Sequence, residues 1–140
     1  MIKRKDILFR AKLNSRPEFI YWNEYGELCT KNGKRTRYEK INIVGKTTYY
    51  DYIYQMKSLV DFSTLGRYTG GKDKNGVKIF EGDIVLTYSH NLPGVHYVIS
   101  YLPDTAQFVA KRMTDSTHYI SFNYDSNEFE VISNMYCSED

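Results

Sequence analysis

The side chains in this sequence that are able to carry out catalysis include three acids near glycine turns. Asp73, Glu81 and Asp83 lie close together in the chain, and a pair of carboxylates is what general acid–base chemistry uses. Acids beside glycine turns more often accept hydrogen bonds from the backbone amides of the turn. We therefore interpret the three acids as turn-stabilising residues rather than as an active site.

The histidines and cysteines show no spacing typical of a metal site or a nucleophile. His90, His96 and His118 lack ligand spacing. Cys29 and Cys137 form no Cys-x-x-Cys pair, and neither is arranged with a histidine or basic partner in the sequence. No phosphate-binding glycine motif occurs. The sequence therefore predicts no catalytic residue, no metal and no cofactor, and two unpaired thiols favour a reducing, cytoplasmic compartment.

Aromatic residues are interleaved with basic ones in the first half of the chain. Residues 1–50 hold 12 Lys and Arg against 5 Asp and Glu, whereas residues 51–140 hold 7 against 12. Aromatic and cationic side chains on one sheet face suit single-stranded nucleic acid. They suit a protein interface equally well, and packing of the rings in the core is a third interpretation. The candidate contact residues are Trp22, Lys34, Arg35, Arg37, Lys40, Tyr50 and Tyr52.

Strand signals dominate the elements that must position these residues. Apolar residues alternate over Ile7–Leu13, and a second strand is expected over Glu18–Asn23. Residues 47–54 are rich in β-branched and aromatic types, which predicts a strand that continues to about Lys57. One face of that strand is expected to carry Tyr50, Tyr52 and Tyr54.

Glycine and asparagine mark the turns. The pair Asn32-Gly33 predicts a type I′ hairpin turn. The pair Asn75-Gly76 predicts a tight hairpin in which Gly76 has a positive φ. Residues 61–66 are expected to form a short capped turn, and residues 67–80 are expected to be rich in turns.

The second half of the chain alternates short apolar runs with turn signals. Strands are predicted over residues 84–88, 97–101, 108–113, 118–122 and 129–136, and strands this short and this close together indicate a small barrel. The predicted fold is thus mainly β, with a β-rich part over residues 1–64 and a barrel over residues 65–140, or one continuous domain. The expected barrel core consists of Ile84, Leu86, Val98, Phe108, Val131 and Ile132.

The run from Leu65 to Val85 resembles the signature of the YopX family of phage and prophage proteins, which reads roughly G-Q-Y-T-G-x-K-D-K-N-G-K-x-I-F/Y-E-G-D-I-V. Residues 8–11 resemble the family's opening K-F-R-A, and residues 130–136 resemble its closing E-V-I-G-N-I-Y. This chain has Lys12, Arg67 and Ser133 where Trp, Gln and Gly are usual. The resemblance implies an SH3-like C-terminal barrel and a phage or prophage context, but it implies no reaction.

The leading hypothesis is therefore a non-enzymatic phage or prophage accessory protein that binds a protein partner or itself. Its candidate partner surface is Lys72, Asp73, Lys74, Glu81 and Asp83. The alternative is a single-stranded nucleic-acid-binding module. A third hypothesis is a MazF-type RNase, because residues 81–86 and 97–100 are superficially similar to the opening of those toxins, although the Arg-Pro before the toxins' second strand is missing. No apolar run approaches the roughly 20 residues of a membrane helix, and no secretory signal is expected at the N-terminus.

Overall fold

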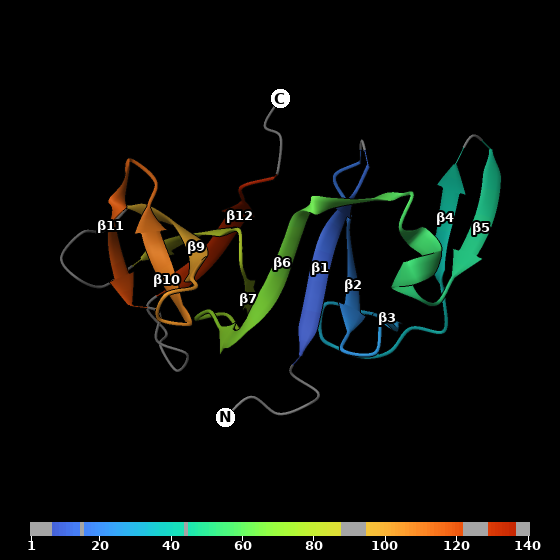
Figure 1. Ribbon diagram of the computed structural model, residues 1–140, viewed down its shortest axis with the longest axis horizontal. Coiled ribbons are helices and arrows are strands. Elements are labelled where there is room, and N and C mark those ends of the chain that lie inside the picture. The colour runs from blue at the N-terminus through green and yellow to red at the C-terminus, as the bar shows by residue number, and fades with distance from the viewer. Residues whose placement is uncertain (1–6, 15, 44, 88–94, 122–128, 137–140) are drawn as a thin grey trace. The chain divides into compact units, whose positions relative to one another are not determined.

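The computed structural model describes residues 7–14, 16–43, 45–87, 95–121 and 129–136, and it confirms a mainly β protein (Figure 1). His90 and Cys137 lie outside the described residues. Within the described part there is no α-helix, and no helix is long and apolar enough to cross a membrane. The elements in chain order are β1 (Leu8–Leu13), β2 (Phe19–Asn23), β3 (Leu28–Cys29), β4 (Glu39–Ile43), β5 (Lys46–Tyr50), the 3₁₀ helix η2 (Ile53–Met56), β6 (Val60–Lys72), β7 (Lys78–Phe80), β8 (Asp83–Thr87), β9 (His96–Leu102), β10 (Gln107–Arg112), β11 (Asp115–Ser121) and β12 (Phe129–Asn134).

The chain divides into two compact units, residues 1–67 and 68–140. Strand β6 runs through this division. Its first part pairs antiparallel with β1, and its last part pairs with β7. The predicted boundary between residues 64 and 65 falls inside this strand.

The first unit packs one sheet face against a two-stranded ribbon and a short helix. Strands β3, β2, β1 and β6 lie side by side in that order, while β4 and β5 pair with each other. Figure 1 shows this ribbon next to the 3₁₀ helix at one end of the unit. The strands predicted at Ile7–Leu13 and Glu18–Asn23 are confirmed as β1 and β2. The core of the unit consists of Ala11, Leu13, Ile20, Trp22, Leu28, Ile41, Met56 and Val60.

The prediction of a strand reaching Lys57 is wrong, because β5 ends at Tyr50. The Gln55 side-chain oxygen accepts hydrogen bonds from the backbone amides of Asp51 and Tyr52, each at 3.0 Å. These bonds hold the start of a 3₁₀ turn whose last residue, Met56, is completely buried. Tyr50, Tyr52 and Tyr54 therefore do not share a strand face.

The prediction of turns over residues 61–72 is also wrong, because this segment forms most of the long strand β6. The pairing of β1 with β6 shifts register between Arg10 and Lys12. At that irregularity the Thr64 hydroxyl accepts a hydrogen bond from the Lys12 amide at 2.7 Å. Gly66 pairs with Arg10 in the middle of β6. Inside a strand, a glycine marks an irregularity of the hydrogen-bond ladder rather than the end of the element.

Three turns of the protein share one design, which differs from a type I′ hairpin. In residues 23–27, 30–34 and 73–77 the first amide donates to the last carbonyl, and the fourth residue, a glycine with positive φ, donates to the first carbonyl. The predicted positive φ of Gly76 is confirmed at 81°. Asn32 and Asn75 do not have positive φ, so the type I′ turn predicted at Asn32-Gly33 is wrong. The turns at residues 30–34 and 73–77 both match the three-residue hairpin loop that ends in a left-handed glycine.

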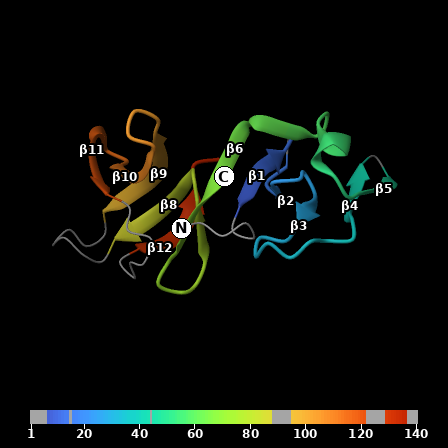
Figure 2. The ribbon, with the colours of Figure 1, turned by 60° about the horizontal axis from the view of Figure 1, so that its bottom comes forward.

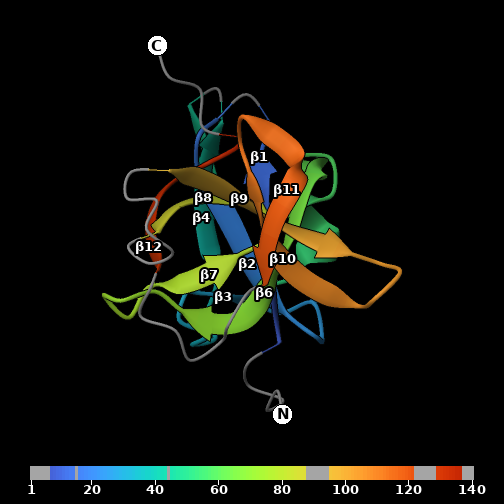
Figure 3. The same ribbon diagram turned by 90° about the vertical axis from the view of Figure 1, so that its left-hand side faces the viewer.

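The second unit contains a five-stranded antiparallel sheet with the order β11-β10-β9-β8-β12 (Figures 2 and 3). Its hydrophobic cluster consists of Ile79, Val85, Tyr97, Ile99, Ala110 and Phe129. The described strands do not close into a barrel, since β11 and β12 are the two ends of the sheet order. The predicted SH3-like barrel is therefore not confirmed.

The predicted core of this unit is partly wrong, because β8 and β9 turn the other face inward. Val85 is buried instead of Ile84 and Leu86, and Tyr97 and Ile99 are buried instead of Val98. Both faces of these strands carry apolar residues, so alternation does not distinguish them. Asp83 fixes which face of β8 is turned inward, because its buried carboxylate accepts a hydrogen bond from the Phe80 amide at 2.7 Å.

In β12 the buried residue is Phe129, with 1% of its surface exposed, whereas the predicted core residue Ile132 is 45% exposed. The register between β8 and β12 shifts between Val131 and Ser133, which places Ile132 at the irregularity. Phe108 and Val131 are partly buried and pack against the cluster, as expected.

We predict that Phe129→Ala lowers the free energy of unfolding by about 3–5 kcal/mol, because it removes a fully buried ring. The exposed Ile132 is the matched control, and Ile132→Ala should change stability by less than about 0.5 kcal/mol. Urea unfolding followed by circular dichroism measures both. Equal losses for the two variants would contradict the burial of β12 described above.

Candidate binding surface

The signature turn at residues 73–77 is organised by the carboxylate of Asp73, which is 3% exposed. One carboxylate oxygen accepts hydrogen bonds from the amides of Asn75, at 2.8 Å, and Val77, at 2.9 Å. The other accepts from the amide of Val131 at 2.9 Å. The turn-stabilising role that the sequence predicts for Asp73 is confirmed.

The same turn covers the edge of β12. Besides the bond from Val131 to Asp73, the Lys74 amide donates to the carbonyl of Phe129 at 3.0 Å. The Lys74 ammonium lies 3.9 Å from the Glu130 carboxylate. Unpaired backbone groups on an edge strand invite pairing with other chains, and here the turn occupies two of them. The signature therefore has a structural function in this unit.

The polar residues predicted as a partner surface do not form one exposed patch. Asp73 and Asp83 are buried in bonds to backbone amides. Lys72 and Lys74 are exposed, and Glu81 is half-buried. The two lysines are the only members of this set that the structure places fully at the surface.

The aromatic residues predicted as contacts are mostly packed. Trp22 is 8% exposed and lies in the core of the first unit, where its ring stacks on that of Phe9 with centroids 6.0 Å apart. Tyr50 packs against the same core. Tyr52 is half-buried, and its ring stacks on the exposed ring of Tyr54 with centroids 5.5 Å apart.

The predicted cations, by contrast, are at the surface. Lys34, Arg35, Arg37 and Lys40 are all exposed. Arg35 is held in place by Glu27, with Nε 2.9 Å from the carboxylate, and its guanidinium lies 5.8 Å from the ring centre of Tyr52. The structure thus brings Arg35 and Tyr52 together at the surface, whereas Trp22 is buried in the core.

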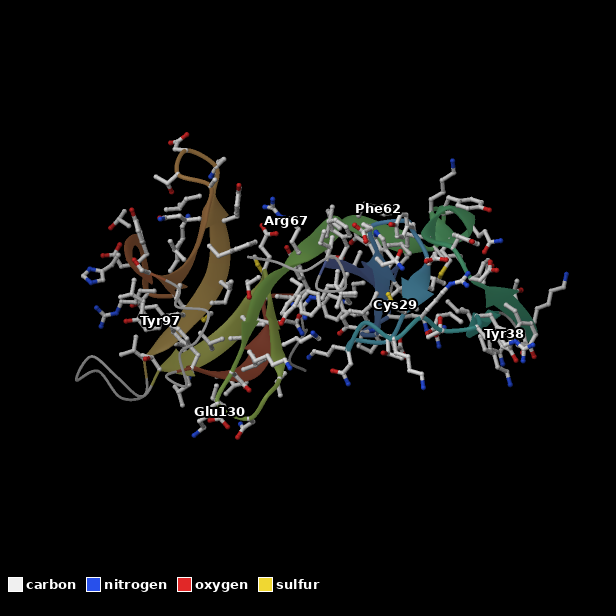
Figure 4. All side chains as sticks on the ribbon, turned by 90° about the horizontal axis from the view of Figure 1, so that it is seen from below. Cys29, Tyr38, Phe62, Arg67, Tyr97 and Glu130 are labelled. Atoms are coloured by element: carbon white, nitrogen blue, oxygen red, sulfur yellow. The ribbon has the colours of Figure 1, made fainter. Side chains whose placement is uncertain are left out.

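Two exposed tyrosines at the ribbon, one just before β4 and one in β5, were not predicted as contacts from the sequence. Tyr38 and Tyr49 are 50% and 54% exposed, and their rings meet edge to face with centroids 4.8 Å apart. Figure 4 labels Tyr38 beside the ribbon. The phase of β5 explains the omission: Tyr50 packs on the core, so its neighbour Tyr49 points the other way. The sequence carries no signal that separates the two tyrosines. The register does so, because Thr48 pairs with the buried Ile41, which puts Thr48 and Tyr50 on the core side.

We call this side of β4 and β5 the ribbon face. Lys40 pairs directly with Tyr49 and Asn42 pairs with Thr47, while Ile41 and Tyr50 belong to the opposite side. Side chains of an antiparallel ribbon that are opposite each other, or two apart, share a face. The ribbon face consists of Tyr38, Lys40, Asn42, Thr47 and Tyr49.

A groove of about 350 Å³ borders the ribbon face. Lys40, Asn42 and Thr47 line it from the ribbon, and the core residues Leu13 and Ile20 also line it. Its charged residues include the pair Arg16 and Glu18, in which the guanidinium lies 3.5 Å from the carboxylate. The groove thus joins apolar core atoms to a polar, mixed-charge lining.

Cationic charge dominates the chain around the ribbon face. Residues 30–50 contain Lys31, Lys34, Arg35, Arg37, Lys40 and Lys46 but only one acid, Glu39. Glu39 pairs with Tyr50 on the core side of the ribbon. Burial raises the pKa of the Glu39 carboxyl above its ordinary value. A negatively charged partner therefore meets an excess of positive charge along this segment, except at the groove, where Glu18 and Glu39 lie beside Arg16 and Lys40.

Cys29 is a structural thiol. Its side chain is buried, and desolvation, with a smaller contribution from the Glu27 charge, raises the pKa of the thiol to about 11. A nucleophilic cysteine needs a depressed pKa, so this site is chemically inert at neutral pH. Among the described residues no group of three or more His, Cys, Asp and Glu side chains is arranged to hold a metal ion.

The model of the family described as YopX protein matches residues 8–139. The search of curated proteins found no match.

We predict that Asp73→Ala lowers the free energy of unfolding by about 3 kcal/mol or more, because it removes a charged acceptor and leaves three amides without it. Asp73→Asn should lose less, since an amide oxygen serves the equivalent turn at Asn23, where it accepts from the amides of Tyr25 and Glu27. Urea unfolding measures both variants.

The control for this prediction is Asp115, an exposed aspartate at the start of β11 that accepts hydrogen bonds from the amide and hydroxyl of Thr117. Its alanine variant should lose far less stability than Asp73→Ala. Similar losses for the two alanine variants would show that burial of Asp73 against β12 adds nothing.

Cys29 generates a prediction about alkaline pH. The unfolded thiol has a pKa of about 8.5, and the folded one is raised to about 11. Between these values the unfolded state binds fewer protons, so stability falls as pH rises. The stability of the wild type relative to Cys29→Ala should therefore decrease from about pH 8 to about pH 10.5. A difference that stays constant over this range would contradict the raised pKa.

Proposed function

Because the chain belongs to the YopX protein family, whose model matches residues 8–139, we propose that it is a phage- or prophage-encoded accessory protein that acts by binding rather than by catalysis. A phage context and a cytoplasmic location in the bacterial host belong to this proposal, and their support is the family resemblance and the lack of a Cys-x-x-Cys pair in the sequence. The partner is a protein, a second copy of this chain, or single-stranded nucleic acid.

The use made of the reactive side chains supports a non-catalytic role. Asp73 and Asp83, two of the three acids that suggested acid–base chemistry, are buried acceptors of backbone hydrogen bonds. The Cys29 thiol is buried with a raised pKa. These groups are committed to the fold, and a buried acid bonded to amides is not available to a substrate.

An SH3-like arrangement of the second unit belongs to this proposal as well. Its support is the family signature together with the bonds that the 73–77 turn makes to the edge of β12. These bonds link the β6–β7 hairpin to the five-stranded sheet at one of its two ends.

The observation that carries the binding proposal is the ribbon face. Two tyrosine rings, each at least half exposed, sit in edge-to-face contact next to an exposed lysine. Tyrosine supplies a large contact area at a low cost in side-chain entropy and is enriched in binding hot spots. Exposed rings held in this way are suited to contact with another macromolecule.

Photo-crosslinking in cells tests this proposal. A benzoylphenylalanine is placed at Tyr49, on the ribbon face, and in a separate protein at Tyr119, which has a similar exposure of 49% in the second unit. We expect light-dependent adducts from position 49 and few from position 119, because only the ribbon face contacts the partner. Adducts from neither position, or equal adducts from both, would contradict a binding role for this face.

A further inference from the structure

The polar surroundings of Tyr38 and Tyr49 decide which class of partner fits the ribbon face. The other three residues of the face, Lys40, Asn42 and Thr47, are all polar. The centre of a protein interface is depleted of charge and rich in apolar contacts. The ribbon face instead combines rings with a lysine, an amide and a hydroxyl.

Exposed rings beside cations and polar side chains are the components of a site for single-stranded nucleic acid. Bases stack on the aromatic side chains, and phosphates contact the cations. Tyr38 and Tyr49 supply two exposed rings, and Lys40 is directly opposite Tyr49 across the ribbon. The edge-to-face contact of the two rings at 4.8 Å fixes them against each other, so fewer side-chain rotations are lost on binding.

The distribution of charge favours the same partner. Exposed Lys34, Arg37 and Lys40 belong to the segment that leads into the ribbon and forms its face. Lys46 is also exposed, but it pairs with Ile43 on the same side of the ribbon as Glu39. The one acid of that segment, Glu39, lies on the core side with a pKa raised by burial. A polyanion is therefore attracted to the ribbon, whereas an acidic peptide would supply charge but no bases for the rings.

We infer that the ribbon face binds single-stranded nucleic acid, with bases stacked on Tyr38 and Tyr49 and phosphates on the cations of the ribbon. This inference rests on the proposed binding function and names its partner. Double-stranded nucleic acid is a poor fit, because the faces of its bases are stacked inside the helix and are not accessible to the rings.

Fluorescence anisotropy with the full chain tests the inference. The probe is a labelled single-stranded DNA or RNA of mixed sequence, about 15 nucleotides long, which is the upper range of such binding sites. About four phosphate contacts imply a log–log salt slope near −3, so affinity should fall roughly 50-fold between about 50 and about 200 mM salt. A duplex of the same sequence should bind more weakly than the single strand at both salt concentrations.

The variants separate stacking from charge. Tyr49→Ser should weaken binding by about 10-fold or more, because it removes one stacking ring. Tyr49→Phe keeps the ring and should bind within about 3-fold of the wild type. Tyr119→Ser removes an equally exposed tyrosine of the second unit and should leave affinity unchanged. Circular dichroism of each variant establishes that it is folded.

The outcomes distinguish this inference from the proposed function. No oligonucleotide binding at micromolar protein in the lower salt overturns the inference. If position 49 still forms adducts to protein in cells, the binding function stands and its partner is a protein or a second copy. Binding that Tyr49→Ser and Tyr119→Ser affect equally also overturns the inference, since nucleic acid then binds elsewhere. If heparin displaces the oligonucleotide and Tyr49→Ser leaves the affinity unchanged, the protein attracts nucleic acid by charge alone. That result likewise refutes stacking.

Discussion

The second unit depends on one buried carboxylate. Asp73 accepts hydrogen bonds from the amides of Asn75 and Val77 within its own turn, and from the amide of Val131 in the last strand. A buried charge is costly unless hydrogen bonds satisfy it, and here three amides do so. Because one side chain joins a local turn to a strand 58 residues away, the geometry of the turn and the edge of the sheet are set together.

In the first unit, the β4–β5 ribbon packs on the core through one side only, which leaves its other side exposed. The β4–β5 ribbon pairs only with itself in the described part of the chain. A two-stranded ribbon alone is marginally stable in water, so its position depends on Ile41 and Tyr50 packing against the core. One side of the ribbon is therefore covered by the core. The other side presents Tyr38, Lys40 and Tyr49 to solvent.

The same physical ambiguity limited prediction of the core and of the candidate site. In β8 the predicted inward residue Ile84 and the actual one, Val85, are adjacent aliphatic residues. In β5 the predicted contact Tyr50 and the exposed Tyr49 are adjacent tyrosines. A shift of one residue exchanges the faces of a strand, and neighbours of equal polarity carry no local signal for choosing between them. The exposed cations were predicted correctly as surface groups because lysine and arginine are rarely buried.

Local chemistry was readable from the sequence alone. The positive φ of Gly76 and the turn-binding role of Asp73 follow from residue types within the five positions of one turn. The strands at Ile7–Leu13 and Glu18–Asn23 follow from residue types within one short run each. The family signature is a local pattern of the same kind. Only the tertiary structure decided that Trp22 is buried, that residues 60–72 form one strand through two units, and which tyrosines face solvent. Burial and strand pairing depend on contacts with residues far along the chain. The spacing of neighbouring residues gives no information about where those distant residues lie.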